Sequence, residues 1–138
     1  MSDISTLREV FAVNSLIPIL RIFDEAMARG FYLTYLGGAE TFSHRFDPDA
    51  PLYLGVQLHG ADLHLSEHFG DATPGSSIRL KIDDLPRYHT QLIKTPYPNA
   101  NPSISEQPWG LDMPMSDPFG NRIIFYQSKS GTPAKRYG

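Results

Sequence analysis

The sequence predicts an α+β fold in which two βαβββ modules form a curled mixed sheet around a concave cleft, with the helices on the outer face. The first observation is the order of the expected elements, which runs strand, helix and three strands and then repeats. In the repeat, a proline-rich loop stands where a sixth strand would begin. The second observation is the alternation along the strands, where one face is apolar and the other is mixed. Helices that cover only one face of each sheet leave the opposite faces to curl around a cavity.

Length and composition limit the class of protein. A chain of 138 residues fits one domain, 1–138, and 41% hydrophobic with 20% charged residues is typical of soluble globular proteins. The net charge of −3 is too small to indicate a nucleic-acid or membrane partner, and it mildly favours a cationic ligand. The absence of cysteine excludes disulfides and thiol nucleophiles. With no apolar run long enough for a signal peptide or a membrane span, we expect a cytoplasmic protein.

The first module is expected over about 15–68. It begins with a strand over 16–23, in which Pro18 indicates an edge position or a bulge. Asp24 is a suitable N-cap for a helix whose apolar residues recur at three- and four-residue spacing. Gly37-Gly38 ends this helix, because glycine readily adopts the backbone conformation that follows a last helical turn.

Three strands complete the first module, over 41–46, 52–58 and 61–67. His59-Gly60 joins the last two as a tight hairpin. Residues 1–14 are weakly patterned and are expected to form an arm or a short helix.

The second module is expected over about 76–127. It opens with an alternating strand over 77–82, and Asp83 or Asp84 caps the helix that follows. A helix cap is also the preferred interpretation of these two neighbouring carboxylates, ahead of an acid–base pair. Three prolines then force an irregular loop, Pro96, Pro98 and Pro102.

A hairpin closes the second module, with strands over 111–115 and 122–127 around a turn at 117–121. The tail, 128–138, is rich in Ser, Gly, Lys and Arg and is expected to be mobile. Trp109 stands just before the hairpin as the only tryptophan of the chain, and either packing or ligand contact would suit it.

Alternation divides the strand residues into two faces. The apolar set is expected under the helices: Leu20, Ile22, Leu63, Leu65, Ile78, Leu80, Ile123 and Phe125. Their neighbours are expected on the concave side: Ile17, Ile19, Arg21, Asp62, His64, Ser66, Ser77, Arg79, Arg122, Ile124 and Tyr126. A polar solvent face would give a similar pattern, but the isoleucines among the charges favour a ligand cleft, which combines apolar walls with a few polar groups.

Three segments resemble a known superfamily: IPILRIFDEAMARGFYLTYLGG over 17–38, LHLSEHFGDATPGSSIRLKIDDL over 63–85 and QPWGLDMPMSDPFGNRIIF over 107–125. They resemble the vicinal-oxygen-chelate superfamily of glyoxalases, ring-cleaving dioxygenases and bleomycin-resistance proteins. PWG followed by DP-x-GN is most similar to the bleomycin-resistance branch. The resemblance implies paired βαβββ modules and a homodimer whose strands are exchanged or joined side by side.

The metal enzymes of that superfamily carry His or Glu ligands at four equivalent strand positions, which here hold Ile17, His64, Ser77 and Ile124. Only His64 can ligate, and one imidazole cannot hold a catalytic metal, which needs about three protein ligands. The resemblance therefore implies a binding protein of the bleomycin-resistance type that sequesters a small, bleomycin-like molecule without a cofactor. The alternative is a metal-dependent glyoxalase-like lyase or dioxygenase that holds a divalent metal with His64 and ligands from elsewhere, such as Glu67, Asp62 or a partner subunit.

No catalytic residue is assigned. The candidate ligand-binding residues are Trp109, His64, Ser66, Asp62, Arg79, Arg122 and Tyr126. The two arginines could neutralise Asp62 or bind an anionic ligand, and the sequence leaves both open. HLSEH over 64–68 matches the H-x-x-E-H pattern of zinc peptidases, but that chemistry needs a helix. On a strand the two histidines lie roughly 13 Å apart, too far to share one ion.

Overall fold

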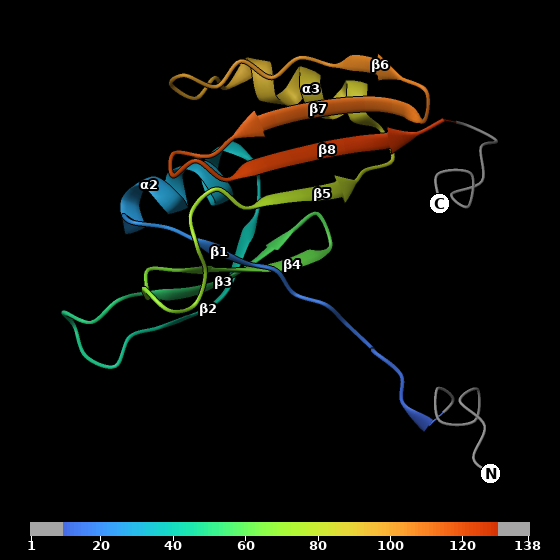
Figure 1. Ribbon diagram of the computed structural model, residues 1–138. Coiled ribbons are helices and arrows are strands. Elements are labelled where there is room, and N and C mark those ends of the chain that lie inside the picture. The colour runs from blue at the N-terminus through green and yellow to red at the C-terminus, as the bar shows by residue number, and fades with distance from the viewer. Residues whose placement is uncertain (1–9, 130–138) are drawn as a thin grey trace, which may run out of the picture.

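The protein, described here by a computed structural model over residues 10–129, contains two four-stranded mixed sheets. Their strand orders are β1-β4-β3-β2 and β5-β8-β7-β6 (Figure 1). Helix α3 packs against β8 and the helical segment η1 packs against β3, so each module has its helix on one face of its sheet. The predicted α+β architecture of paired modules is confirmed. No helix in the described part of the chain is long and apolar enough to cross a membrane.

The first module follows the predicted order. Its elements are β1 (Ile19–Arg21), α2 (Glu25–Arg29), η1 (Gly30–Tyr35), β2 (Ala39–His44), β3 (Tyr53–Leu58) and β4 (Ala61–Ser66). The Asp24 side chain accepts a hydrogen bond from the Met27 amide, as expected of an N-cap. His59 and Gly60 both have positive φ, which is the geometry of the predicted tight hairpin.

The second module repeats the order. Its elements are β5 (Ser77–Lys81), α3 (Leu85–Lys94), β6 (Ser105–Gln107), β7 (Gly110–Ser116) and β8 (Arg122–Ser128). Of the two candidate caps, Asp84 accepts from the Arg87 amide. The sixth strand exists, although the prolines before it led us to expect only a loop. It covers Gly110–Asp112. Among residues 10–129, no strand pairs with the rest of β7 on that side, so Pro114 fits within the strand without losing a ladder hydrogen bond.

Each module begins with a strand at the edge of its sheet that runs parallel to the last strand of the same module. Strand β1 pairs in parallel with β4, with Ile19 opposite His64, Leu20 opposite Leu65 and Arg21 opposite Ser66. Strand β5 pairs in parallel with β8. The edge position predicted from Pro18 is therefore confirmed, although regular pairing spans only three residues of the expected 16–23.

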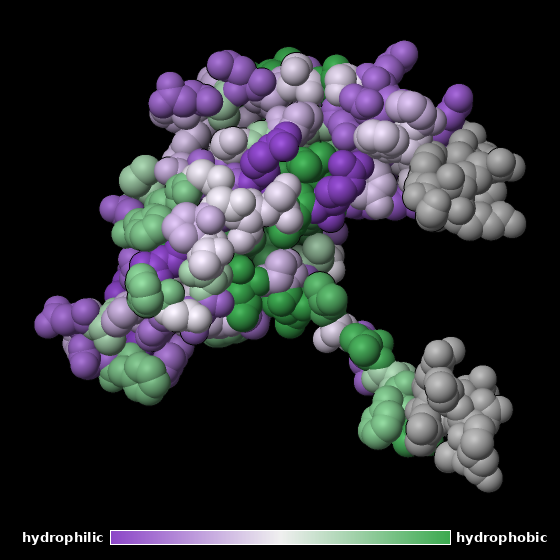
Figure 2. All heavy atoms as spheres, viewed as in Figure 1, coloured by the Kyte–Doolittle hydropathy of each residue, from purple (hydrophilic) through white to green (hydrophobic). Residues whose placement is uncertain are grey.

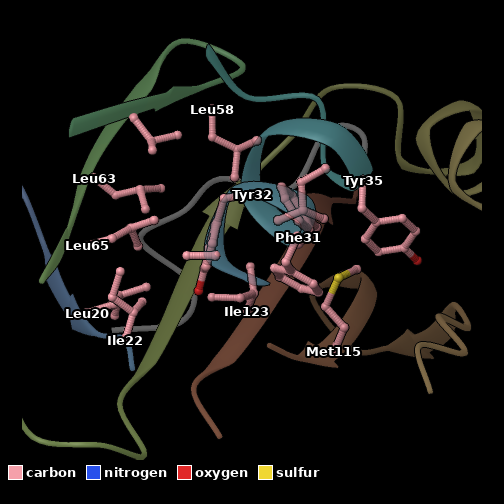
Figure 3. Packing of buried hydrophobic residues seen from close by; sticks show 14 of the residues in the cluster. Leu20, Ile22, Phe31, Tyr32, Tyr35, Leu58, Leu63, Leu65, Met115 and Ile123 are labelled. Atoms are coloured by element: carbon pink, nitrogen blue, oxygen red, sulfur yellow. The ribbon is translucent and has the colours of Figure 1, made fainter. Parts of the chain in front are cut away.

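The predicted apolar face forms the core. Six of its eight members are buried, and Ile78 and Leu80 are partly buried against the same cluster. Figure 3 shows Leu20, Ile22, Leu63 and Leu65 pointing toward Tyr32 of η1, with Ile123 nearby. The alternation of the sequence thus identified which face of each strand the helices cover.

Two details of the helix and the termini differ from the prediction. The expected single α-helix continues after Arg29 as a π-helix, which ends near Gly37 with a positive φ. Ser128 belongs to β8, and the Lys129 amide donates to the Trp109 carbonyl, so these two residues are tied to the second sheet rather than part of a tail. The arm expected over 1–14 and the mobile tail lie largely outside the described residues.

The DPFGN turn connects the two modules. Asp117 and Asn121 are both buried, and the Asn121 amide group donates 2.8 Å hydrogen bonds to Asp117 and to the Arg21 carbonyl of β1. Tyr32 of η1 donates a 2.5 Å hydrogen bond to the same Asp117 carboxylate. Burial raises the pKa of Tyr32 well above its usual value, and the Asp117 charge and hydrogen bond add to the effect. This motif therefore holds the second module against β1 and η1 of the first.

Candidate functional site

A cavity of about 520 Å³ opens where the first strands of the two modules approach each other. It is lined by the segment 15–18 before β1, by 60–63 at the start of β4, and by 78–80 of β5. Figure 2 shows hydrophobic side chains gathered in the hollow at the root of the N-terminal segment. Three residues predicted on the concave side, Ile17, Asp62 and Arg79, line this cavity.

Four side chains form a cluster on the C-terminal sheet beside this cavity, which we name the Trp109 cluster: Arg79, Trp109, Asp112 and Tyr126. The Arg79 guanidinium donates to both oxygens of Asp112 at 3.0 and 3.3 Å, and Trp109 Nε1 donates to Asp112 Oδ1 at 2.8 Å. The same guanidinium lies 4.5 Å from the Tyr126 ring centre and 5.6 Å from that of Trp109. Aromatic faces and a bidentate ion pair thus hold one another in place.

Asp112 was not among the predicted site residues. Burial raises its pKa, but hydrogen bonds from Arg79 and Trp109, with the Arg79 charge, outweigh burial and leave the pKa below its usual value. The carboxylate is therefore charged at neutral pH and neutralises Arg79. The suggestion that Arg79 pairs with Asp62 is wrong, since its ion pair in the described structure is with Asp112. The predicted hairpin could have placed Asp112 beside Tyr126, which lies opposite it in the β7–β8 ladder, but not beside Arg79.

His64 lies in a second aromatic cluster, on the concave face of the N-terminal sheet. Its Nδ1 is 2.7 Å from the Tyr53 hydroxyl, and its ring makes edge contacts with Tyr53 and Phe42, each with centres 5.1 Å apart. Gly55 makes room for this arrangement, since a Cβ there would lie 2.2 Å from the Phe42 ring. Burial raises the pKa of Tyr53, as does the nearby Asp71 charge, so its hydroxyl stays protonated at neutral pH.

Two other predicted residues have different environments. Ser66 is fully buried, its hydroxyl donates to Asp71 at 2.6 Å, and it accepts from the His68 amide. Ser66 is therefore not accessible to a ligand, and its proposed contact role is corrected. Arg122 is exposed and lies opposite Ser77 in the β5–β8 ladder.

The donor set at the four superfamily metal positions does not fit a divalent cation. Ile17 and Ile124 have no donor atoms, Ser77 is a weak ligand, and His64 Nδ1 is engaged with Tyr53. Within residues 10–129, no group of three His, Asp or Glu side chains is arranged to hold a metal ion. Glu67, named as an alternative ligand, accepts a hydrogen bond from the Leu52 amide at 2.7 Å.

The sequence matches the profile of a family described as Glyoxalase superfamily protein over residues 2–132. A comparison with curated proteins finds no match. The fold is similar to that of TnmS3, an antibiotic binding protein from Streptomyces sp. CB03234, with a TM-score of 0.66, 23% identity, and coverage of 86% of this chain and 100% of that chain.

Two further solved structures are bleomycin-binding proteins. One, from Streptomyces verticillus in complex with copper(II)-bleomycin, has a TM-score of 0.65 and 22% identity, with coverage of 86% of this chain and 99% of that chain. The other, complexed with bleomycin, has a TM-score of 0.63 and 22% identity over 85% of this chain and 100% of that chain. At 22% identity, these similarities show a shared fold and do not by themselves show a shared ligand.

Proposed function

Because the chain belongs to the glyoxalase superfamily, we propose that it binds a small organic molecule in the concave cleft and sequesters it without a catalytic metal. Structural similarity to antibiotic-binding and bleomycin-binding proteins supports a ligand-binding role of the bleomycin-resistance type. Since homologous frames accept chemically unrelated molecules, the ligand has to be argued from the residues of this cleft. We also propose that the protein acts in the cytoplasm and that its binding of the ligand confers antibiotic resistance.

The Trp109 cluster is the observation that carries the proposal. Trp109 is partly exposed, and its indole is held at the edge by Asp112 and approached on its ring by Arg79. A partly exposed aromatic ring that is fixed by its polar edge is suited to stack on a planar ligand. Residues that only fill a core do not need this combination of exposure and fixation.

We also propose a homodimer. The segment before β1 exposes large apolar side chains: Val10 is 65% exposed, Phe11 79%, Val13 86% and Leu16 83%. Apolar side chains gathered on one extended segment favour a protein surface that covers them. A second copy that covers this segment would also narrow the cleft, because residues 15–18 form one of its walls.

The test is a calorimetric titration of the purified protein with copper(II)-bleomycin and a panel of planar aromatic compounds. Loss of the stacking contact in Trp109→Phe should weaken binding by about tenfold, up to about thirtyfold. The melting temperature should fall by only about 3 °C, because one partly buried hydrogen bond is lost. In the wild type, the single tryptophan allows the same titrations to be followed by fluorescence quenching.

Two results would overturn the proposal. The first is near one equivalent of tightly held metal per chain by elemental analysis, lost in His64→Ala, which would favour the lyase or dioxygenase. The second is no binding by any compound of the panel together with a collapse of the melting temperature in Trp109→Phe, which would assign Trp109 to packing.

A further inference from the structure

The 520 Å³ cavity is lined by one carboxylate that has no ion-pair partner within residues 10–129. This carboxylate belongs to Asp62 of β4, which is exposed. The sequence left open that Arg79 neutralises it, but both Nη atoms of that guanidinium donate to Asp112. The ion pairs of the described structure all involve other carboxylates: Glu25, Glu40, Glu67 and Asp112. Asp62 therefore contributes an unbalanced negative charge to the wall of the cavity.

The strand ladders fix the position of this carboxylate. On one side of β4, Asp62 pairs with Gln57 of β3. On the other side, the parallel pairing of Ile19 with His64 places Ile17 beside Asp62, two residues earlier on both strands. Paired neighbours in a sheet point to the same face, so the Asp62 carboxylate and the Ile17 side chain lie side by side. The charge thus projects from a paired strand rather than from a loop.

The remaining wall of the cavity is mainly apolar. It consists of Leu16, Ile17, Pro18, Leu63, Ile78 and Leu80. Figure 2 shows this hydrophobic surface in the hollow at the root of the N-terminal segment. Leu16 and Ile17 are 83% and 38% exposed, so a ligand that covers them removes apolar surface from water. An apolar wall with a single placed charge is the usual composition of a small-molecule site.

The charge balance of the wall decides which ligand fits. A ligand that fills the cavity displaces water from Asp62, and this desolvation is costly unless the ligand replaces the lost hydrogen bonds. A neutral apolar ligand does not replace them, whereas a cation forms charge-assisted hydrogen bonds with the carboxylate. An anion is repelled by Asp62, and it would have to displace Asp112 from Arg79. The cavity therefore favours a cation over both other classes.

We propose that the cavity binds an aromatic amidine or amine, with the cationic group on Asp62 and the apolar body between residues 15–18 and 78–80. The inference rests on the proposed function, because it names the class of ligand that the cleft takes. Arg79 belongs both to the cavity wall and to the Trp109 cluster, so one ligand can contact both. Asp62 is then the residue that selects the ligand by its charge.

The experiment compares three probes of nearly the same shape, one cationic, one neutral and one anionic: 2-naphthamidinium, 2-naphthamide and 2-naphthoate. In calorimetry, the amidinium should bind at least about tenfold more tightly than the amide, and the naphthoate should bind most weakly. The Ile17 methyl signals locate the binding, and they are assigned by their absence from the spectrum of Ile17→Val. The amidinium should shift these signals saturably, because Ile17 lies beside Asp62 in the wall.

Asp62→Asn removes the charge and keeps the size of the side chain. It should weaken amidinium binding at least about fivefold and leave amide binding unchanged. The melting temperature of the free protein should stay within about 2 °C of wild type, because no ion pair within the described residues is lost. Asp49→Asn is the matched control, since it removes the same charge from an exposed position outside the cavity and should change neither quantity.

Four results would overturn the inference. Equal binding of the three probes, or no binding of any, would show that the cavity does not recognise a cation. Equal weakening by Asp62→Asn and Asp49→Asn would assign the preference to the net charge of the chain. Saturable binding without a shift at Ile17 would place the ligand elsewhere. A fall of more than about 5 °C in the melting temperature of Asp62→Asn would make the residue structural.

The proposed function is tested separately by copper(II)-bleomycin and the panel of planar compounds. If one of these binds and Trp109→Phe weakens that binding, failure of the amidinium series rejects the charge selection by Asp62 alone. If none of them binds and the amidinium series fails as well, both the proposed function and this inference are rejected.

Discussion

Replacing Asn121 with alanine should remove the hydrogen bond from the DPFGN turn to β1 and loosen the turn itself, while the Tyr32–Asp117 bond remains. The side chain donates at 2.8 Å to the Arg21 carbonyl and at 2.8 Å to Asp117, and it accepts from the Ser76 amide at 3.2 Å. Each hydrogen bond contributes about 1 kcal/mol net, and partners left buried without a bond add further cost. We expect the free energy of unfolding to fall by about 3–5 kcal/mol, among the larger effects of a single substitution.

The assay is urea and thermal unfolding followed by circular dichroism. For a chain of this length, the expected loss corresponds to a fall of roughly 10–15 °C in the melting temperature. Asn101→Ala is the matched control, because it makes the same substitution at an exposed position and should change stability by less than about 0.5 kcal/mol. A loss of under about 1 kcal/mol in Asn121→Ala would refute the view that Asn121 contributes to the junction between the modules.

Three further predictions concern the cleft and the assembly. Asp112→Asn should lower stability at neutral pH: the folded-state pKa of Asp112 is lowered, so its contribution is present above the unfolded value of about 3.9 and lost as pH falls through the folded value. Melting curves of mutant and wild type should therefore converge at acid pH, and a constant difference would contradict the ion pair. Gly55→Ala should displace the Phe42 ring and cost about 1–3 kcal/mol, measured by urea unfolding, whereas unchanged stability would mean that the ring adapts freely. Sedimentation at micromolar concentration should give a dimer, and a monomer would count against cover of the exposed N-terminal segment by a second copy.

The sequence predicted the parts of the fold that depend on local pattern. Period-two alternation assigned Leu20, Leu63 and Ile123 to the helix-facing side, where each is buried. Asp24 and the His59-Gly60 pair marked a helix start and a hairpin, because each satisfies a local backbone requirement. Such signals need no knowledge of the rest of the chain.

Features that depend on residues far apart in the chain could not be predicted from the sequence. The three residues of β6 have no pattern of their own, and they form a strand because β7 offers an open edge beside Gly110–Asp112. Ser66 alternates with the core residues and was therefore placed in the cleft, but Asp71 returns from the following loop and binds its hydroxyl. The carboxylate of Asp112 was overlooked because its partner Arg79 lies 33 residues away in the sequence.

The charged residues near the cleft show why the charge of the ligand has to be inferred from individual ion pairs rather than from the net charge of the chain. A net charge of −3 mildly favours a cationic ligand when the chain is considered as a whole. Yet Arg79 is neutralised by Asp112, whereas Arg21 has buried donors and no ion pair within the described residues. Exposed charges are screened within about 10 Å at ordinary salt, but a half-buried guanidinium is screened far less. The electrostatic preference of the cleft therefore depends on which of its arginines is paired, and the net charge of the chain does not determine it.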